Sequence, residues 1–167
     1  LRVAVIFGGQ SAEHEVSLQS AKNVLSALNK DKYEPVLIGI DKTGRWFLNE
    51  DSQMLLNDDN PELIALNESL REVAILPGQN ESQMIDLSGN GMLNRIDVVF
   101  PVLHGPFGED GTIQGLLETM GIPYTGGNVL ASSVGMDKVL MKDVYRQNGI
   151  PTVEYCWFYR DEWLEDP

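Results

Sequence analysis

The sequence predicts a three-layer α/β fold built on a mostly parallel β-sheet. Short, continuous apolar runs at 3–7, 36–40 and 96–100 are typical of strands buried on both faces. Between the first two runs, apolar residues recur at helical spacing, which gives a strand–helix–strand unit. The chain has 167 residues, 43% of them hydrophobic and 22% charged, so it can bury the core of one domain.

The first half of the chain alternates strands and turns around one helix. The helix is predicted from an apolar stripe that ends at Asn29-Lys30, where a cation near a helix C-terminus is favourable. The stripe consists of Leu18, Ala21, Val24, Leu25 and Leu28. After the strand at 36–40, a turn at 42–44 is predicted to lead into a short strand at 45–48.

The stretch from 50 to 94 has a less regular pattern. Leu63, Leu66 and Leu70 indicate a short helix, and segments 73–76 and 84–87 can pair as a hairpin. Turn residues cluster at 58–61 and 88–91. We interpret this stretch as an insertion between core elements.

Regular elements return after the strand at 96–100. The pattern predicts a helix at 112–120 closed by Gly121, a short strand at 122–125, and helices at 130–134 and 138–147. Residues 152–159 are predicted to be extended and to begin a following unit.

Charge and cysteine content limit the classes of partner. The formal net charge is −13 without a basic cluster, which disfavours nucleic acid and anionic membranes. The single cysteine, Cys156, excludes an intrachain disulfide and fits a reducing, cytoplasmic location. No apolar run is long enough to span a bilayer, and no signal-peptide pattern opens the chain.

Two glycine-rich loops follow predicted strands and precede predicted helices, at 8–15 and 104–111. Ligands of parallel α/β sheets bind at the carboxyl ends of the strands, so the two loops are expected to face each other if their strands are neighbours. Glu13 is suited to an ammonium group, and His104 to a carboxylate or phosphate. A helix N-terminus adds partial positive charge for an anion. The pattern fits a zwitterion such as an amino acid.

Structural roles for the same residues stay open at this point. Glu13 and Glu15 can complement a helix dipole, and His104 can be a structural histidine. Glu109 and Asp110 are expected to cap the helix that follows them. Asp41 ends a strand as a ribose-binding acid would, but the first loop lacks the G-x-G-x-x-G pattern of dinucleotide sites.

Four segments in this order resemble the N-terminal part of the D-alanine–D-alanine ligases, in the longer bacterial form that has an insertion between the loops. They are Phe7-Gly-Gly-Gln-Ser-Ala-Glu-His-Glu-Val-Ser17, Leu103-His-Gly-Pro-Phe-Gly-Glu-Asp-Gly-Thr-Ile-Gln-Gly115, Pro123-Tyr-Thr-Gly126 and Met136-Asp-Lys138. The resemblance covers essentially the whole chain. It implies an ATP-grasp enzyme whose first domain has Rossmann-like (pre-ATP-grasp) topology.

The resemblance also implies a reaction and a set of roles. ATP phosphorylates one D-alanine, a second D-alanine attacks the acyl phosphate, and the dipeptide enters peptidoglycan synthesis. Glu13 and His104 are the expected catalytic contacts to the first D-alanine, beside Val16 and the backbone at Gly9 and Gly105. Lys138 is expected to reach the ATP phosphates. The ligands of Mg²⁺ are expected outside these residues, and a homodimer is implied.

We expect residues 1–150 to form the substrate-binding α/β domain, with its insertion near 45–94. Residues 151–167 are then the start of the ATP-grasp part. Both ends of the chain are abrupt, so we expect a piece of a longer enzyme that is inactive alone. Two alternatives remain from sequence: a ligase that joins D-alanine to D-lactate or D-serine, and a stand-alone module that binds an amino acid or nucleotide.

Overall fold

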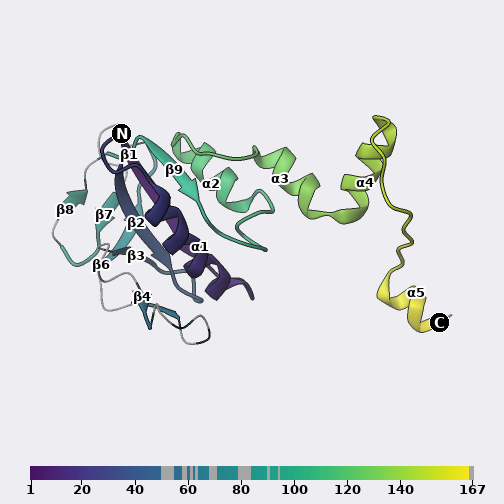
Figure 1. Ribbon diagram of the computed structural model, residues 1–167, viewed down its shortest axis with the longest axis horizontal. Coiled ribbons are helices and arrows are strands. Elements are labelled where there is room, and N and C mark those ends of the chain that lie inside the picture. Colours follow the sequence, from purple (N-terminus) through teal and green to yellow (C-terminus); the bar gives the residue numbers. More distant parts are fainter. Residues whose placement is uncertain are drawn as a thin grey trace.

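The computed structural model describes residues 1–49, 55–57, 60, 62, 64–67, 71–78, 84–89, 91–93 and 95–165 (Figure 1). The strands are β1 (Arg2–Gly8), β2 (Glu34–Ile40), β3 (Trp46–Asn49), β4 (Leu55–Leu56), β5 (Ala65–Leu66), β6 (Arg71–Ile75), β7 (Met84–Asp86), β8 (Gly91–Leu93) and β9 (Val98–Pro101). The helices are α1 (His14–Ala27), α2 (Thr112–Met120), α3 (Val129–Met136), α4 (Lys138–Gln147) and α5 (Arg160–Glu165).

The main sheet is mixed, with the strand order β8-β7-β6-β3-β2-β1-β9. Within the described residues, β1 pairs in parallel with both β2 and β9, and the other neighbours in this sheet pair antiparallel. The α/β class is confirmed, but the prediction of a mostly parallel sheet is corrected. The reason is connection length: only residues 41–45 separate β2 from β3, and a parallel pair needs a crossover of a dozen or more residues.

Strand β1 separates two apolar cores, one on each face of the sheet. Val5 and Phe7 pack with Leu18 of α1, whereas Ala4 and Ile6 belong to the core that contains Leu117 of α2. Alternate residues of a strand point to opposite faces, so a continuous apolar run fills both cores. Helices α1 and α2 therefore cover opposite faces of the parallel part of the sheet.

The region between β3 and β9 extends the sheet. The predicted hairpin is confirmed, since β6 and β7 pair antiparallel with Ile75 opposite Met84. The short helix predicted around Leu66 is wrong at that residue, because Leu66 lies in β5, paired with Leu55 of β4. The other two leucines of that prediction, and most of the 58–61 turn, lie outside the described residues.

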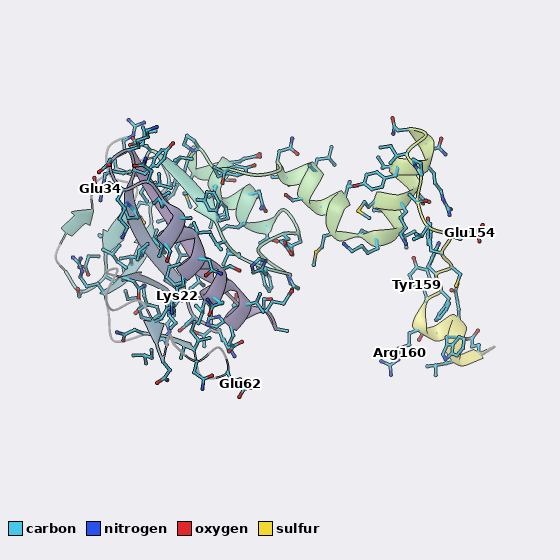
Figure 2. The ribbon with its side chains drawn as sticks, in the orientation of Figure 1. Lys22, Glu34, Glu62, Glu154, Tyr159 and Arg160 are labelled. Atoms are coloured by element: carbon cyan, nitrogen blue, oxygen red, sulfur yellow. The ribbon has the colours of Figure 1, made fainter. Side chains whose placement is uncertain are left out.

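The C-terminal helices leave the body of the molecule. Figure 1 shows α3, α4 and α5 extending away from the sheet in the green and yellow part of the chain, and none of the three has a buried residue. In Figure 2 the side chains of Glu154, Tyr159 and Arg160 lie on this extension, far from Lys22 and Glu34 on the body. Across the described ranges, no helix has the length and apolar content needed to cross a membrane.

Candidate functional site

Two loops meet where β1 and β9 end. These strands are parallel neighbours, with Ile6 opposite Pro101, so the segments that leave them lie at one edge of the sheet. A Cβ at Gly105, whose φ is +70°, would come within 2.6 Å of Glu13 Oε2. The expected juxtaposition of the loops is thus confirmed, and residue 105 must be glycine for this approach.

The first loop is fixed by backbone and buried side chains. The N–H of Gly9 donates to the Ile40 carbonyl at 2.8 Å, and the Gly9 carbonyl lies 2.8 Å from Nδ1 of His14. A carbonyl oxygen can only accept, so Nδ1 of His14 carries a hydrogen. His14 is 4% exposed, which makes it a structural residue of the loop.

Ser17 joins three segments beneath the loops. It is completely buried, its hydroxyl donates to the Val102 carbonyl at 2.5 Å, and it accepts from the Gly8 N–H at 2.7 Å. No role was predicted from the sequence for His14, Ser17 or Ser20. His14 and Ser17 belong to the first motif and Ser20 follows it by three residues, and polar residues on the inner side of a helix need buried partners.

Glu13 stands at the N-cap position of α1, yet its side chain makes no capping hydrogen bond to the described part of the chain. Its carboxylate instead lies against Gly105 of the second loop. Val16, in the first turn of α1, is 54% exposed. Glu15 differs, because it pairs with Lys42 at 2.6 Å, and this hydrogen bond lowers the pKa of its carboxyl. Glu15 therefore has a structural partner, whereas the Glu13 carboxylate faces the space between the loops.

His104 is held between a hydroxyl and a carboxylate. Its Nε2 lies 3.0 Å from Oγ of Ser20, and its Nδ1 lies 4.0 Å from Oε1 of Glu109. The other oxygen of Glu109 accepts the Gly105 N–H at 2.8 Å. The expectation that Glu109 caps α2 is therefore wrong: its carboxylate faces back into the loop. The imidazole side chain is 31% exposed, so a ligand can reach it.

Asp110 accepts hydrogen bonds at the start of α2, the capping role that the sequence predicted for both Glu109 and Asp110. Its carboxylate accepts from the N–H groups of Phe107 and Thr112. Burial opposes ionisation, but these hydrogen bonds outweigh it and lower the pKa of Asp110. Asp110 thus fixes the turn between the second loop and the helix.

A cavity of about 290 Å³ opens on the α2 side of the same edge. Its lining is largely apolar and includes Trp46, Leu103 and Phe107, together with Gly9 and His104. Phe107 has a φ of +66°, a conformation rare for a bulky residue. Glu13 and Val16 are outside this lining, whereas His104 and Gly9 are part of it.

Asp41 is a turn residue. Its carboxylate accepts from the backbone and side chain of Thr43 and of Arg45. Burial raises its pKa, but these donors together lower it below the usual 3.8. Every oxygen is thereby engaged by the chain itself, which argues against a ribose contact.

Lys138 is not brought to the loops. It begins α4, where Asp137 accepts from the Val139 and Leu140 N–H groups, and its Nζ lies 3.5 Å from the Gly135 carbonyl. Figure 1 shows α4 well removed from the sheet edge. Among the described residues, no group of three or more His, Cys, Asp or Glu side chains could hold a metal ion.

Comparison with known proteins gives a consistent result. Residues 2–127 match the family model described as "D-ala D-ala ligase N-terminus". The chain is 48% identical over 159 residues to a D-alanine–D-alanine ligase of Shouchella clausii, and 51% identical over 150 residues to one of Sodalis glossinidius. These alignments cover 95% and 90% of this chain but 43% and 41% of the relatives.

The fold is also shared with solved structures. That of the D-alanine–D-alanine ligase from Coxiella burnetii matches with a TM-score of 0.78 at 40% sequence identity. The match covers 92% of this chain and 43% of that one. The chain therefore spans less than half the length of the proteins it resembles, and the part it matches is their N-terminal part.

Proposed function

We propose, since this chain belongs to the D-alanine–D-alanine ligase family through its N-terminal domain, that it supplies the substrate-binding part of an ATP-dependent ligase. In the proposed reaction, a carboxylate oxygen of the first D-alanine attacks the γ-phosphorus of ATP and ADP leaves. The amine of the second D-alanine then attacks the acyl carbon of this mixed anhydride. The bond between the acyl carbon and the phosphate oxygen breaks, and inorganic phosphate departs. The product dipeptide serves peptidoglycan synthesis.

The observation that carries this proposal is the position of Glu13. Its carboxylate lies between the two loops without acting as a cap, at the N-terminus of α1. An ammonium group can pair with this carboxylate, and the positive end of the helix favours the substrate carboxylate nearby. These two features match the two charges of an amino acid.

Further roles in the proposed site follow from the geometry around Glu13. Val16 is exposed at the first turn of α1 and offers an apolar surface to a methyl group. His104 presents a partly exposed imidazole that can orient the substrate carboxylate. Gly9 and Gly105 keep the backbone of the two loops close to the ligand.

ATP enters the proposal as a substrate, and Mg²⁺ as a cofactor, of the longer enzyme. Magnesium, when bound, would neutralise charge on the transferring phosphate. The described residues hold no suitable acidic cluster, so no step is assigned to magnesium here. We propose that Lys138 reaches the ATP phosphates when the remainder of the ligase is present, because it stands exposed on the extension that carries α4.

The domain boundary and assembly are proposals of the same kind. The two-sided packing around β1 supports a Rossmann-like, pre-ATP-grasp organisation for the parallel part of the sheet. We propose residues 1–150 as the substrate-binding domain; the family model matches residues 2–127 of it, and Ile122 is the last buried residue in the described part of the chain. We also propose a cytoplasmic homodimer, which sedimentation of the complete ligase would check.

The test uses the complete ligase that contains these residues. D-alanine should stimulate phosphate release from ATP, and L-alanine should not. Glu13→Gln should raise the KM for the first D-alanine about ten- to a hundredfold, because a charge-assisted contact contributes about 1.5–3 kcal/mol. Glu15→Gln is the matched control, since Glu15 pairs with Lys42. An enzyme that D-alanine does not stimulate would refute the proposed function, and unchanged kinetics in Glu13→Gln would refute the role of Glu13.

A further inference from the structure

The side chain that faces His104 from α1 is Ser20. Its Oγ lies 3.0 Å from Nε2 of His104, across 84 positions of sequence. Ser17, one helical turn earlier, makes the neighbouring contact to the Val102 carbonyl. Positions three apart lie on one face of a helix, so the two serines fasten α1 to the start of the second loop at two adjacent points.

The surroundings of the imidazole decide which nitrogen carries a hydrogen. On the Nδ1 side stands the carboxylate of Glu109, at 4.0 Å, itself anchored by the Gly105 N–H. A carboxylate favours an N–H that points toward it, which leaves the lone pair on Nε2. The hydroxyl of Ser20 is the group placed to donate to that lone pair.

We propose that Ser20 is a positioning residue for His104, whose hydroxyl donates to Nε2 and thereby fixes both the ring orientation and the Nδ1–H tautomer. A serine on a helix can otherwise donate to the carbonyl four residues earlier, as Ser26 does to Lys22 at 2.9 Å. Ser20 instead reaches across to the loop. The hydrogen bond itself is independent of the proposed function, whereas its effect on D-alanine rests on that function.

The chain is suited to a direct test because it contains two histidines, His14 and His104. Imidazole ¹⁵N NMR on the 167-residue chain therefore gives two sets of signals, and His14 serves as an internal reference with its Nδ1–H fixed by Gly9. In Ser20→Ala, the His104 signals should move toward the Nε2–H tautomer, and the His14 signals should stay in place. The tautomer ratio should change roughly two- to tenfold, as for loss of one ordinary hydrogen bond.

Two further variants sharpen the result. Ser20→Thr keeps a hydroxyl and should restore the His104 pattern of the parent chain. Ser26→Ala removes a hydroxyl from the same helix and should leave His104 unchanged. A parent-like His104 pattern in Ser20→Ala, or the same change in Ser26→Ala, would overturn the proposal.

The kinetic readout separates this inference from the proposed function. In the complete ligase, Ser20→Ala should raise the KM for the first D-alanine roughly two- to tenfold with a smaller change in kcat, and Ser20→Thr should reverse it. If the NMR changes occur but the parent enzyme has no D-alanine-dependent turnover, the proposed function fails and the positioning role stands. An unchanged KM in an active Ser20→Ala enzyme would refute the functional part of the inference.

Discussion

Ser17→Ala should lower the free energy of unfolding strongly, although it removes a single oxygen atom. The hydroxyl of Ser17 donates to the carbonyl of Val102, just after β9, and accepts from the N–H of Gly8 at the end of β1, and the residue is 0% exposed. Ser17→Ala would leave the Gly8 N–H and the Val102 carbonyl without this partner, in a site closed to water. Each buried group left unsatisfied costs about 1–3 kcal/mol, so loss of both partners is expected to lower the unfolding free energy by roughly 2–6 kcal/mol.

That loss is large beside the 5–15 kcal/mol typical of a whole domain. For a chain of this size it corresponds to a fall in Tm of roughly 4–24 °C. Urea unfolding followed by circular dichroism measures the change, with Ser26→Ala as control because Ser26 is exposed and bonds within its own helix. If Ser17→Ala unfolds within 0.5 kcal/mol of the parent chain, the three segments are not held together through this hydroxyl.

Three other predictions concern Asp41, Gly105 and Cys156. Asp41→Asn should destabilise the chain at neutral pH. Burial raises the pKa of Asp41, but its hydrogen bonds outweigh burial and hold the pKa below 3.8. The contribution of the ionised carboxylate to the free energy of unfolding is therefore full above pH 3.8 and is lost as the pH falls through the lowered pKa. Urea midpoints of parent and variant should therefore converge as the pH falls through the lowered pKa of Asp41, and a gap that stays constant with pH would contradict this. Gly105→Ala should lower stability by about 1–2 kcal/mol and displace Glu13, since residue 105 has φ +70° and a Cβ would meet Glu13 Oε2; an unaltered urea midpoint would contradict it. Cys156 is exposed, so one equivalent of a thiol reagent should react with the native chain at the rate of a free thiol, and a slow reaction would show that it is covered.

The buried elements were predictable because their patterns have one physical meaning. The apolar runs became β1, β2 and β9, and α2 and α4 occupy the ranges predicted for them. Gly121 closes α2 in the left-handed conformation expected of a C-cap. These features depend on local periodicity and on backbone freedom, both of which a single sequence displays.

Sheet direction was not predictable in the same way. The core strands β1 and β2 have seven residues each, whereas the hairpin strands β6 and β7 have five and three, and nothing local to β3 or β6 says that they continue the sheet of β1. Strand pairing is decided by connection length and by which edges remain uncovered. The segment at 122–125 was predicted as a strand from its local pattern. In the structure it forms one isolated β-bridge, between Val99 and Tyr124.

At the site, the sequence singled out Glu13 and His104, which the structure places on two adjoining loops, and it missed the residues that hold these loops. Glu13 and His104 attract notice because charged groups in glycine-rich loops are unusual. Ser17, Ser20 and His14 are ordinary polar residues within a helix, and only the fold shows that they face inward. Glu109 was assigned to a cap because it precedes a helix, but Gly105 competes for its carboxylate.

Helix α1 and the residue that precedes it link the two loops over about two turns. Glu13 precedes the helix and touches Gly105, Ser17 bonds both β1 and the segment after β9, and Ser20 reaches His104. A shift of α1 would therefore move the proposed ammonium contact and the imidazole together, and it would break buried hydrogen bonds in doing so. The two serines should therefore differ in the effect of their loss. Loss of Ser17 should mainly lower the free energy of unfolding. Loss of Ser20, which is only partly buried, should change the tautomer of His104 while the fold persists. Measuring unfolding free energy and the His104 signals on both variants tests that division directly.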